Sequence, residues 1–155
     1  MVIRIREMGS SDRAVWAGLR RELWPAHAES EDAQWVDEII EGKDYFGFVA
    51  ETDDGRAAGF AEVAIRPYAN GCDTHPVPFL EAIFVKPEYR RQRVAAQLIA
   101  FIQDFVVARG FRELGSDALL ANTASHAAHR AWGFEETERV VYFRKQLSSS
   151  NQGSL

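Results

Sequence analysis

The segment from residue 78 to residue 109 constrains the fold more than any other part of this 155-residue chain. It begins with an almost continuous apolar run, PFLEAIFV, which is typical of a central strand buried in a sheet. Pro87 ends the run, three arginines follow between positions 90 and 93, and a helix is predicted over about 93–109. A buried strand, a cationic loop and a helix in this order predict an α/β sheet with an anion site at the helix N-terminus.

The sequence predicts that residues 1–147 form a single domain of strands and helices. Strands are expected over 2–7, 45–52, 57–66, 78–85 and 112–118, and a last one within 133–147. Helices are expected from the SSD cap at 10–12 to Pro25, over about 29–40, over about 93–109, and from a cap at Asn122 or Thr123. This order predicts the α/β class, a mixed sheet with helices on its faces. The tail, 148–155, is expected to be mobile because it lacks apolar residues until its end.

Two of these helices carry apolar residues at helical spacing. In the first helix the spaced residues are Val15, Leu19 and Leu23. In the long helix the apolar face consists of Leu98, Ile99, Ile102, Phe105 and Val106. Faces of this kind are expected to pack against the sheet.

Composition argues against several classes of protein. The net charge of −5 argues against a general nucleic-acid binder, because contacts to phosphates dominate such binding. No apolar run reaches the roughly 18 residues of a membrane span, and the N-terminus resembles no signal peptide, so a cytoplasmic location is expected. The single cysteine, Cys72, excludes an internal disulfide and a multi-cysteine metal site, and no metal is expected. An acidic chain with a basic loop instead predicts two ligands of opposite charge.

The three arginines, Arg90, Arg91 and Arg93, are the strongest local signal. Basic side chains at a helix N-terminus oppose the helix dipole, so an anionic ligand explains them better than a solvated basic turn does. Guanidinium groups suit this task because they donate two parallel hydrogen bonds to a phosphate.

The strand–loop–helix unit resembles the acetyl-CoA signature of the GNAT superfamily of N-acetyltransferases. The signature, Gln/Arg-x-x-Gly-x-Gly/Ala, corresponds here to Arg90-Arg91-Gln92-Arg93-Val94-Ala95, so Arg93 replaces a glycine. Four more stretches resemble the aminoglycoside 6′-N-acetyltransferases: LWPAH at 23–27, NGCD at 70–73, PVPFLE at 76–81 and GFEETERVVYFRK at 133–145.

This resemblance implies the GNAT fold, with a central mixed sheet of about six to seven strands and about four helices. It implies acetyl-CoA as co-substrate and transfer of its acetyl group to the 6′-amine of an aminoglycoside, an antibiotic-resistance activity. It also implies a homodimer whose C-terminal strands contribute to the interface.

The resemblance also assigns contacts to acetyl-CoA. The backbone near Ile83 and Val85 would pair with the amide-bearing arm of the molecule, and the arginine loop would bind its pyrophosphate. Asn122 is expected to contact the same arm or simply to cap its helix. His129 stands where many GNAT enzymes carry a tyrosine acid and is expected to contact the cofactor. The full expected set is Ile83, Phe84, Val85, Arg90, Arg91, Gln92, Arg93, Val94, Ala95, Ala96, Asn122 and His129.

A polycationic acceptor calls for carboxylates. Glu81 lies inside an apolar strand, where an ionised group needs either a cleft or an internal salt bridge to an arginine. Asp117 follows a predicted strand and is either a ligand contact or a turn former. The resemblance gives both residues substrate binding, and both are candidates for the base that deprotonates the amine. It places the remaining substrate contacts at Trp24, His27, Tyr68, Asp73 and Glu138, the last from a partner subunit.

Two alternatives stay open from the sequence. A GNAT enzyme with these residues could acetylate another polyamine, a small amine or a protein N-terminus. A non-catalytic module that binds CoA is the second alternative, because Arg93 stands in place of the signature glycine.

Overall fold

The computed structural model describes residues 1–148, and within them five strands form one mixed sheet. The strands are β1 (Arg4–Glu7), β2 (Tyr45–Glu51), β3 (Ala57–Arg66), β4 (Val77–Val85) and β5 (Gly115–Ser116). They follow the order β1-β2-β3-β4-β5 across the sheet. Neighbouring strands are antiparallel except for β4 and β5, which are parallel. The predicted α/β class is confirmed, and the sheet has fewer strands than the six to seven expected.

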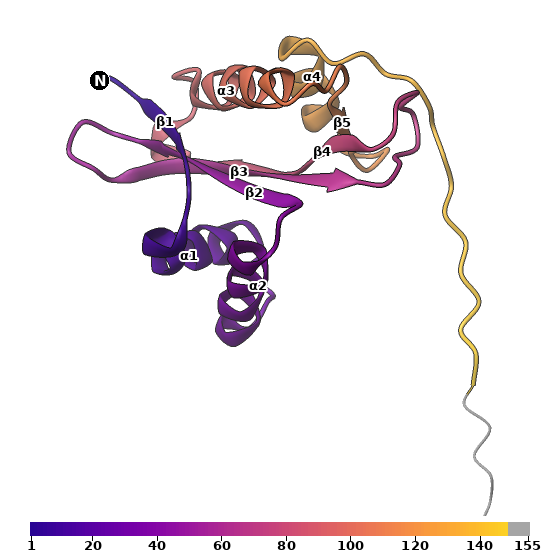
Figure 1. The fold of residues 1–155 in the computed structure, drawn as a ribbon, viewed down its shortest axis with the longest axis horizontal. Coiled ribbons are helices and arrows are strands. Elements are labelled where there is room, and N and C mark those ends of the chain that lie inside the picture. The colour runs from indigo at the N-terminus through magenta and orange to yellow at the C-terminus, as the bar shows by residue number, and fades with distance from the viewer. Residues whose placement is uncertain (149–155) are drawn as a thin grey trace, which may run out of the picture.

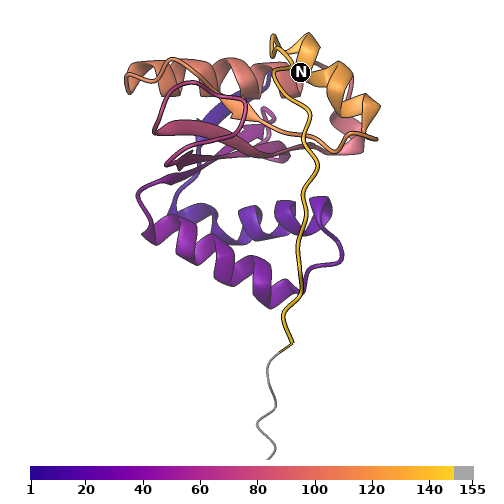
Figure 2. The ribbon, with the colours of Figure 1, turned by 90° about the vertical axis from the view of Figure 1, so that its right-hand side faces the viewer.

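Helices cover both faces of the sheet. They are α1 (Arg13–Leu23), α2 (Glu29–Glu41), α3 (Val94–Ala108) and α4 (Thr123–Ala131), with short 3-10 turns at Ser10–Asp12 and Pro87–Tyr89. Helices α1 and α2 lie on one face and α3 and α4 on the other (Figure 1). The view along the perpendicular direction shows the three layers edge-on (Figure 2).

Each face of the sheet has its own core. The five residues expected on the apolar face of α3 are all buried, and they pack with Phe48 of β2. On the opposite face Trp16 and Leu19 of α1 pack with Val36 of α2. The expectation for Val15 was wrong, because its side chain is 48% exposed and Trp16 takes the central position.

Gly47 of β2 explains how so large a residue as Trp16 fits. A Cβ atom at Gly47 would lie 2.2 Å from the Trp16 ring, so only glycine leaves room for the indole at this position. The sheet and α1 therefore approach closely at this point, which is directly beside the polar cluster described below.

Strands β4 and β5 separate to form a fork. On β4, Leu80 pairs with Val63 and Ala82 pairs with Glu62, so Glu81 is the extra residue of a β-bulge. Strand β5 pairs with β4 only at Phe79 and Leu80. The strand expected over 112–118 is thus only two residues long, and beyond Leu80 the outer edge of β4 has no partner strand within residues 1–148.

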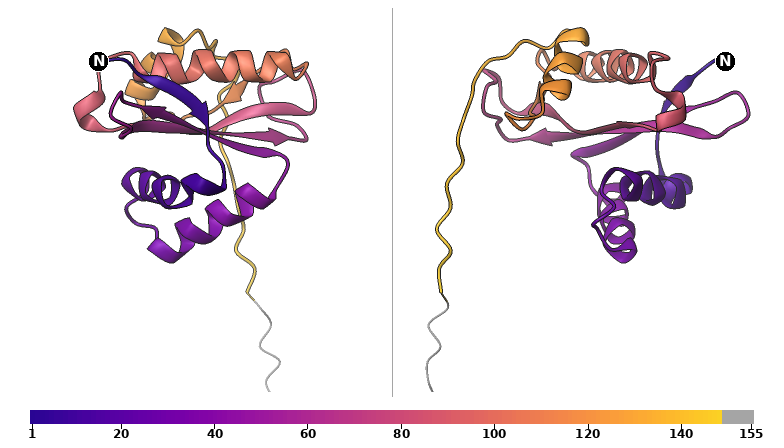
Figure 3. Two further views of the ribbon diagram at one scale, coloured as in Figure 1. Left: turned by 60° about the vertical axis from the view of Figure 1, so that its left-hand side comes forward. Right: turned by 180° about the vertical axis from the view of Figure 1, so that it is seen from behind.

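The last expected strand, within 133–147, does not form in residues 1–148. This segment leaves α4 and runs away from the body of the molecule, as Figure 1 and the right view of Figure 3 show. Its alternating apolar residues, such as Val141 and Phe143, are exposed. The prediction of a strand here is wrong for residues 1–148, in which no neighbouring strand pairs with this segment. The tail that was expected to be mobile lies outside the described residues except for Ser148.

Candidate functional site

The arginine loop has an unusual backbone. Arg91 and Arg93 both have a φ of 62°, in the left-handed region that costs a residue with a side chain about 1–2 kcal/mol. Arg93 directly precedes α3 and is therefore outside the helix, whose N-terminus has no side-chain cap. The first N–H groups of the helix, from Val94 onward, are thus open to a ligand. Arg93 adopts the conformation that suits the glycine of the signature, which explains why the loop keeps its shape without that glycine.

The fork exposes backbone groups of β4. Lys86 donates its N–H to the carbonyl of Ala58 on β3, and backbone groups alternate in direction along a strand. Ile83 and Val85 therefore point their N–H and C=O groups away from β3, to the open edge. The carbonyl of Val85 accepts a hydrogen bond from Arg90 Nε at 2.9 Å. An extended ligand with amide groups can pair with such an edge as an added strand would.

A serine and a histidine face each other at the mouth of the fork. Ser116, the last residue of β5, lies with its Oγ 2.7 Å from His129 Nε2. His129 Nδ1 lies 2.7 Å from the carbonyl oxygen of Ser125 and must be the protonated nitrogen there. In a neutral ring Nε2 is then the nitrogen that accepts the hydroxyl proton of Ser116. Asn122 caps α4 through a hydrogen bond from the N–H of Ser125, so the capping role left open by the sequence is present.

Glu81 is held by an arginine. Its two oxygens accept hydrogen bonds from Arg66 Nε and Nη2 at 2.7 and 2.8 Å. The Arg66 guanidinium also lies 3.6 Å from the centre of the Phe79 ring. Glu81 and, more weakly, Asp117 raise the pKa of Arg66, so both carboxylates lie in the field of the same cation. The internal salt bridge was one of the two expectations for Glu81, and the structure contains it.

A buried ionic cluster beside this pair was missed by the sequence analysis. Glu62 of β3 is completely buried, and both its oxygens lie 2.5 Å from Arg20 Nη1. The same carboxylate accepts hydrogen bonds from Trp16 Nε1 and from the Tyr45 hydroxyl, each at 2.8 Å. Burial and the neighbouring Glu62 raise the pKa of Tyr45. A glutamate flanked by apolar residues in a strand is the signal that identified Glu81, and the same signal is present at Glu62 in GFAEVAI.

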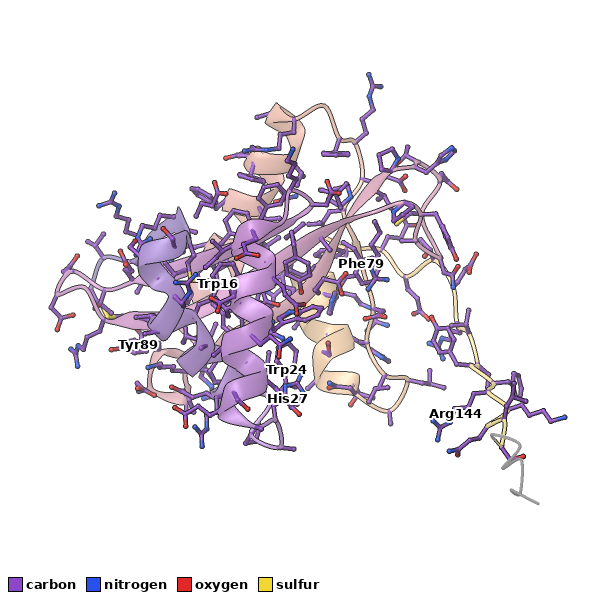
Figure 4. The ribbon with its side chains drawn as sticks, turned by 60° about the horizontal axis from the view of Figure 1, so that its bottom comes forward. Trp16, Trp24, His27, Phe79, Tyr89 and Arg144 are labelled. Atoms are coloured by element: carbon purple, nitrogen blue, oxygen red, sulfur yellow. The ribbon has the colours of Figure 1, made fainter. Side chains whose placement is uncertain are left out.

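Trp24 and His27 form a wall after the end of α1. Their rings stack with centroids 5.6 Å apart and planes 23° from parallel. Figure 4 shows the two residues close together, whereas Arg144 lies far out on the C-terminal segment. Trp24 is half-buried and His27 is exposed, so both rings have an accessible side.

The loop between β3 and β4 holds two further residues that were expected at the site. Tyr68 is 73% exposed, and Asp73 is exposed as well. Glu113 fixes this loop by accepting hydrogen bonds from the backbone N–H groups of Asp73 and Thr74 at 3.0 and 2.5 Å. The hydrogen bond from the Thr74 hydroxyl and, after it, those from the two backbone N–H groups lower the pKa of Glu113.

Glu138 is the expected residue that the single chain does not bring to the site. Thr137 packs against Gly71 of the β3–β4 loop, and the chain then departs from the body with Glu138 exposed. The other expected acceptor residues lie on the sheet, on its connecting loops or at the end of α1.

The acceptor side of the fork is negatively charged. Two carboxylates, those of Glu81 and Asp117, lie in the field of one guanidinium group, that of Arg66, whereas Glu62 and Asp32 are buried against Arg20. Such a field attracts cations. Among residues 1–148 no group of His, Cys, Asp and Glu side chains is arranged to hold a metal ion, and no helix is long and apolar enough to cross a membrane.

Comparisons with known proteins agree with this geometry. The acetyltransferase (GNAT) family profile matches residues 16–134. An aminoglycoside N(6′)-acetyltransferase type 1 from Salmonella enteritidis is 46% identical over 143 residues, which cover 92% of this chain and 98% of that protein. The protein of the same name from Stenotrophomonas maltophilia is 42% identical over 148 residues, which cover 94% and 95%.

Solved structures give the same result. The structure of AAC(6′)-Iy in complex with the bisubstrate analogue CoA-S-monomethyl-acetylneamine has a TM-score of 0.89 and 44% identity, covering 95% of this chain and 100% of that chain. AAC(6′)-Ih from Acinetobacter baumannii has a TM-score of 0.86 and 40% identity, with 95% and 100% covered. The chain therefore belongs to the GNAT family of acetyltransferases.

Proposed function

We propose that this protein transfers the acetyl group of acetyl-CoA to the 6′-amine of aminoglycoside antibiotics and thereby confers resistance. The observation that carries the proposal is the fork itself, with an open strand edge and a basic loop on one side and a negatively charged surface on the other. Relatives that are 40–46% identical over most of the chain bear the name of this activity. A related structure binds an analogue that joins CoA to acetylneamine.

Acetyl-CoA would lie along the loop and the open edge of β4. Its pyrophosphate meets the N-terminus of α3 and the arginines around Arg93, and its amide-bearing arm pairs with the backbone of Ile83 and Val85. This path directs the thioester into the mouth of the fork, between Glu81 and Ser116. The exposed arginine side chains, the open N–H groups of α3 and the free edge of β4 support this placement.

The aminoglycoside would bind against the opposite side of the fork. Glu81 and Asp117 attract its ammonium groups, and Trp24, His27 and Tyr68 enclose the sugar rings. Asp73 lies on the β3–β4 loop and would meet a distal amine. Glu138 would complete the site from the partner subunit, since its own chain carries it away from the body.

Transfer would proceed by direct attack. The 6′-ammonium first loses a proton, and the free amine then forms the N–C bond with the thioester carbonyl to give a tetrahedral intermediate. The nitrogen releases its second proton to water, and the C–S bond breaks to give the amide and CoA thiolate. Asp117 is the better placed base, directly or through a water, because both oxygens of Glu81 are engaged by Arg66. The leaving thiolate is then protonated, and no residue of the chain is assigned as its acid.

Thiol release from acetyl-CoA across a panel of acceptors tests the function. Kanamycin-type aminoglycosides should be turned over, and analogues with a 6′-hydroxyl group should not be acetylated at that position. Equal turnover of both classes would reject the regiochemistry. Faster turnover of spermidine-type polyamines would support an acetyltransferase with another substrate, and binding of acetyl-CoA without thiol release from any acceptor would support a non-catalytic module.

The protein is further proposed to act as a homodimer in the cytoplasm. The C-terminal segment supports the dimer, because its alternating apolar residues, among them Val141 and Phe143, are exposed and lack a partner strand in residues 1–148. A second copy of the chain would cover them and deliver Glu138 to the site. The location follows from the co-substrate, which is an intracellular metabolite.

A further inference from the structure

Trp24 and His27 are called the acceptor wall below, because the proposed function places the aminoglycoside against them. The reaction as proposed above does not require the buried ionic cluster that lies next to this wall. Arg20, Glu62 and Asp32 are only 6%, 0% and 2% exposed. Burying charges carries a large desolvation cost, and well-packed apolar residues in their place are often as stabilising or more so. A cluster of this kind is therefore better explained by the geometry that it imposes than by the stability that it adds.

The Arg20 guanidinium interacts in three directions at once. Its Nη1 lies 2.5 Å from both oxygens of Glu62, and its Nε lies 3.5 Å from Asp32 Oδ1. Its flat face lies over the Trp24 ring, with 4.7 Å between the guanidinium carbon and the ring centre. Only a planar guanidinium can combine an ion pair, a second carboxylate contact and stacking on an aromatic ring, and a lysine ammonium cannot.

Each of these contacts connects Arg20 either to the acceptor wall or to the sheet. Trp24 donates its backbone N–H to the carbonyl of Arg20 at 2.8 Å, so the same residue holds both its backbone and its ring. Asp32 Oδ1 lies 3.4 Å from His27 Nδ1, and His27 stacks on Trp24. Glu62 anchors the assembly to the sheet, since it belongs to β3.

We propose that Arg20 is a positioning residue of the acceptor site. Tied to the sheet through Glu62, it fixes the orientation of Trp24 and His27 and thereby sets the affinity for the aminoglycoside, without any contact to acetyl-CoA. This role rests on the proposed function, in which Trp24 and His27 enclose the acceptor. Arg20 has not been placed in contact with either substrate, so it acts through its neighbours alone.

The neighbouring residue Arg21 supplies a matched control. It is on the same helix but exposed, and it pairs at the surface with Glu29 at 2.8 Å. Arg20→Lys keeps the charge and removes the planar group, so we expect the KM for the aminoglycoside to rise by about 10-fold, equivalent to about 1.4 kcal/mol. Because the cofactor half of the site is separate, kcat should stay within about threefold and the Kd for acetyl-CoA should not change. Arg21→Lys should leave all three quantities unchanged.

A spectroscopic measurement tests the positioning without turnover. With 5-fluorotryptophan incorporated, the ¹⁹F resonance of Trp24, assigned through Trp24→Phe, should shift in Arg20→Lys and stay in place in Arg21→Lys. The resonance of Trp132, on the opposite face of the sheet, should stay in place in both variants. If the wild type acetylates no aminoglycoside, the proposed function is wrong. The Trp24 resonance still reports in that case whether Arg20 fixes the orientation of the Trp24 ring.

Glu62→Gln is the second variant, in case Arg20→Lys does not fold. It preserves the size of the side chain and weakens the anchor of Arg20, so the aminoglycoside KM and the Trp24 resonance should change in the same direction. Wild-type KM together with an unmoved Trp24 resonance in a folded variant would overturn the proposal. An equal loss of affinity for acetyl-CoA and for the aminoglycoside would also overturn it, since that result would indicate a general structural role.

Discussion

Arg93 shows how one residue can combine two opposing requirements. Its backbone must be left-handed, which favours glycine, while its side chain adds a positive charge beside the open N-terminus of α3. From the sequence Arg93 was expected to be the first residue of the helix, and glycine there would have lowered helix propensity. The structure places Arg93 before the helix, so glycine at this position carries no cost in helix propensity. Replacing Arg93 with glycine therefore relieves backbone strain but removes a positive charge.

Replacing Arg93 with glycine should therefore separate stability from affinity. Relief of left-handed strain is worth about 1–2 kcal/mol, and it is partly offset by the greater freedom of glycine in the unfolded chain. Arg93→Gly should thus have a Tm equal to or above that of the wild type. Loss of a charged contact to phosphate, roughly 1.5–3 kcal/mol, should weaken acetyl-CoA binding by about 10-fold or more. Calorimetric titration of both proteins with acetyl-CoA measures the two affinities. Tighter binding by the glycine variant would show that the Arg93 side chain obstructs the cofactor.

Removing the charge of Glu81 should affect the acceptor more than removing that of Asp117. Glu81→Gln also leaves Arg66 unpaired beside a cationic substrate, whereas Asp117→Asn removes one exposed carboxylate. We expect aminoglycoside affinity to fall by about 10- to 150-fold in Glu81→Gln and by less in Asp117→Asn. Asp104→Asn, on the exposed side of α3, is the control and should bind normally. Wild-type kcat/KM in both site variants would place the acceptor elsewhere.

At the scale of elements, the sequence identified those that are built from local signals. Strand β4 and helix α3 were predicted almost to the residue, because one is a buried apolar run and the other has a continuous apolar face. The length of β5 and the unpaired state of the C-terminal segment were not predicted, because the length of a strand depends on the neighbouring strand with which it pairs. The bulge at Glu81 and the cluster around Glu62 also depend on pairing across the sheet, which a single sequence does not display.

The start of the chain is held by a second ionic cluster, and this one predicts a pH dependence. Arg6 of β1 donates to Asp12 at 2.7 and 2.9 Å and to Glu51 of β2 at 2.6 Å. The Arg6 guanidinium holds the pKa of Asp12 below its usual value. Since the folded state favours the ionised form, this contribution is present above the unfolded pKa of about 3.9 and is lost as the pH falls towards the lowered value.

Asp12→Asn should remove that contribution. At pH 7 the variant should lose about 1–3 kcal/mol of unfolding free energy, because Glu51 is then the one carboxylate that Arg6 contacts among residues 1–148 and the carboxylate that accepts the Gly9 N–H is gone. Below about pH 4 the difference from the wild type should shrink, as protonation disables the wild-type contact too. Urea denaturation at pH 7 and pH 3 measures both quantities. Asp53→Asn, in the exposed β2–β3 hairpin, should follow the wild-type curve, and a constant difference at both pH values would rule out this origin.

At the scale of the whole molecule, charge is separated across the fork. The net charge of −5 is combined with a basic loop at α3 and a surplus of carboxylates on the acceptor side. This separation was inferred from the sequence as two ligands of opposite sign, and the topology explains it. The bulge directs Glu81 to one side of β4 while the strand continues to the arginines at its end. Under the proposed function the single chain lacks one acceptor contact, because Glu138 is exposed on the segment after α4.

The C-terminal segment gives the last prediction, which concerns assembly. Phe143 is 92% exposed, and a segment of exposed alternating apolar residues forms a stable strand only when a partner covers it. We expect light scattering to report a dimer at micromolar concentration, and Phe143→Glu to shift it towards the monomer. Lys145→Glu, which alters charge on the same segment without removing an apolar group, should remain dimeric.

If the dimer delivers Glu138, the Phe143→Glu monomer should bind acetyl-CoA normally but lose aminoglycoside affinity by about 10-fold, the effect of one charged contact. A wild-type monomer, or a monomeric variant with unchanged aminoglycoside KM, would contradict a site shared between two chains.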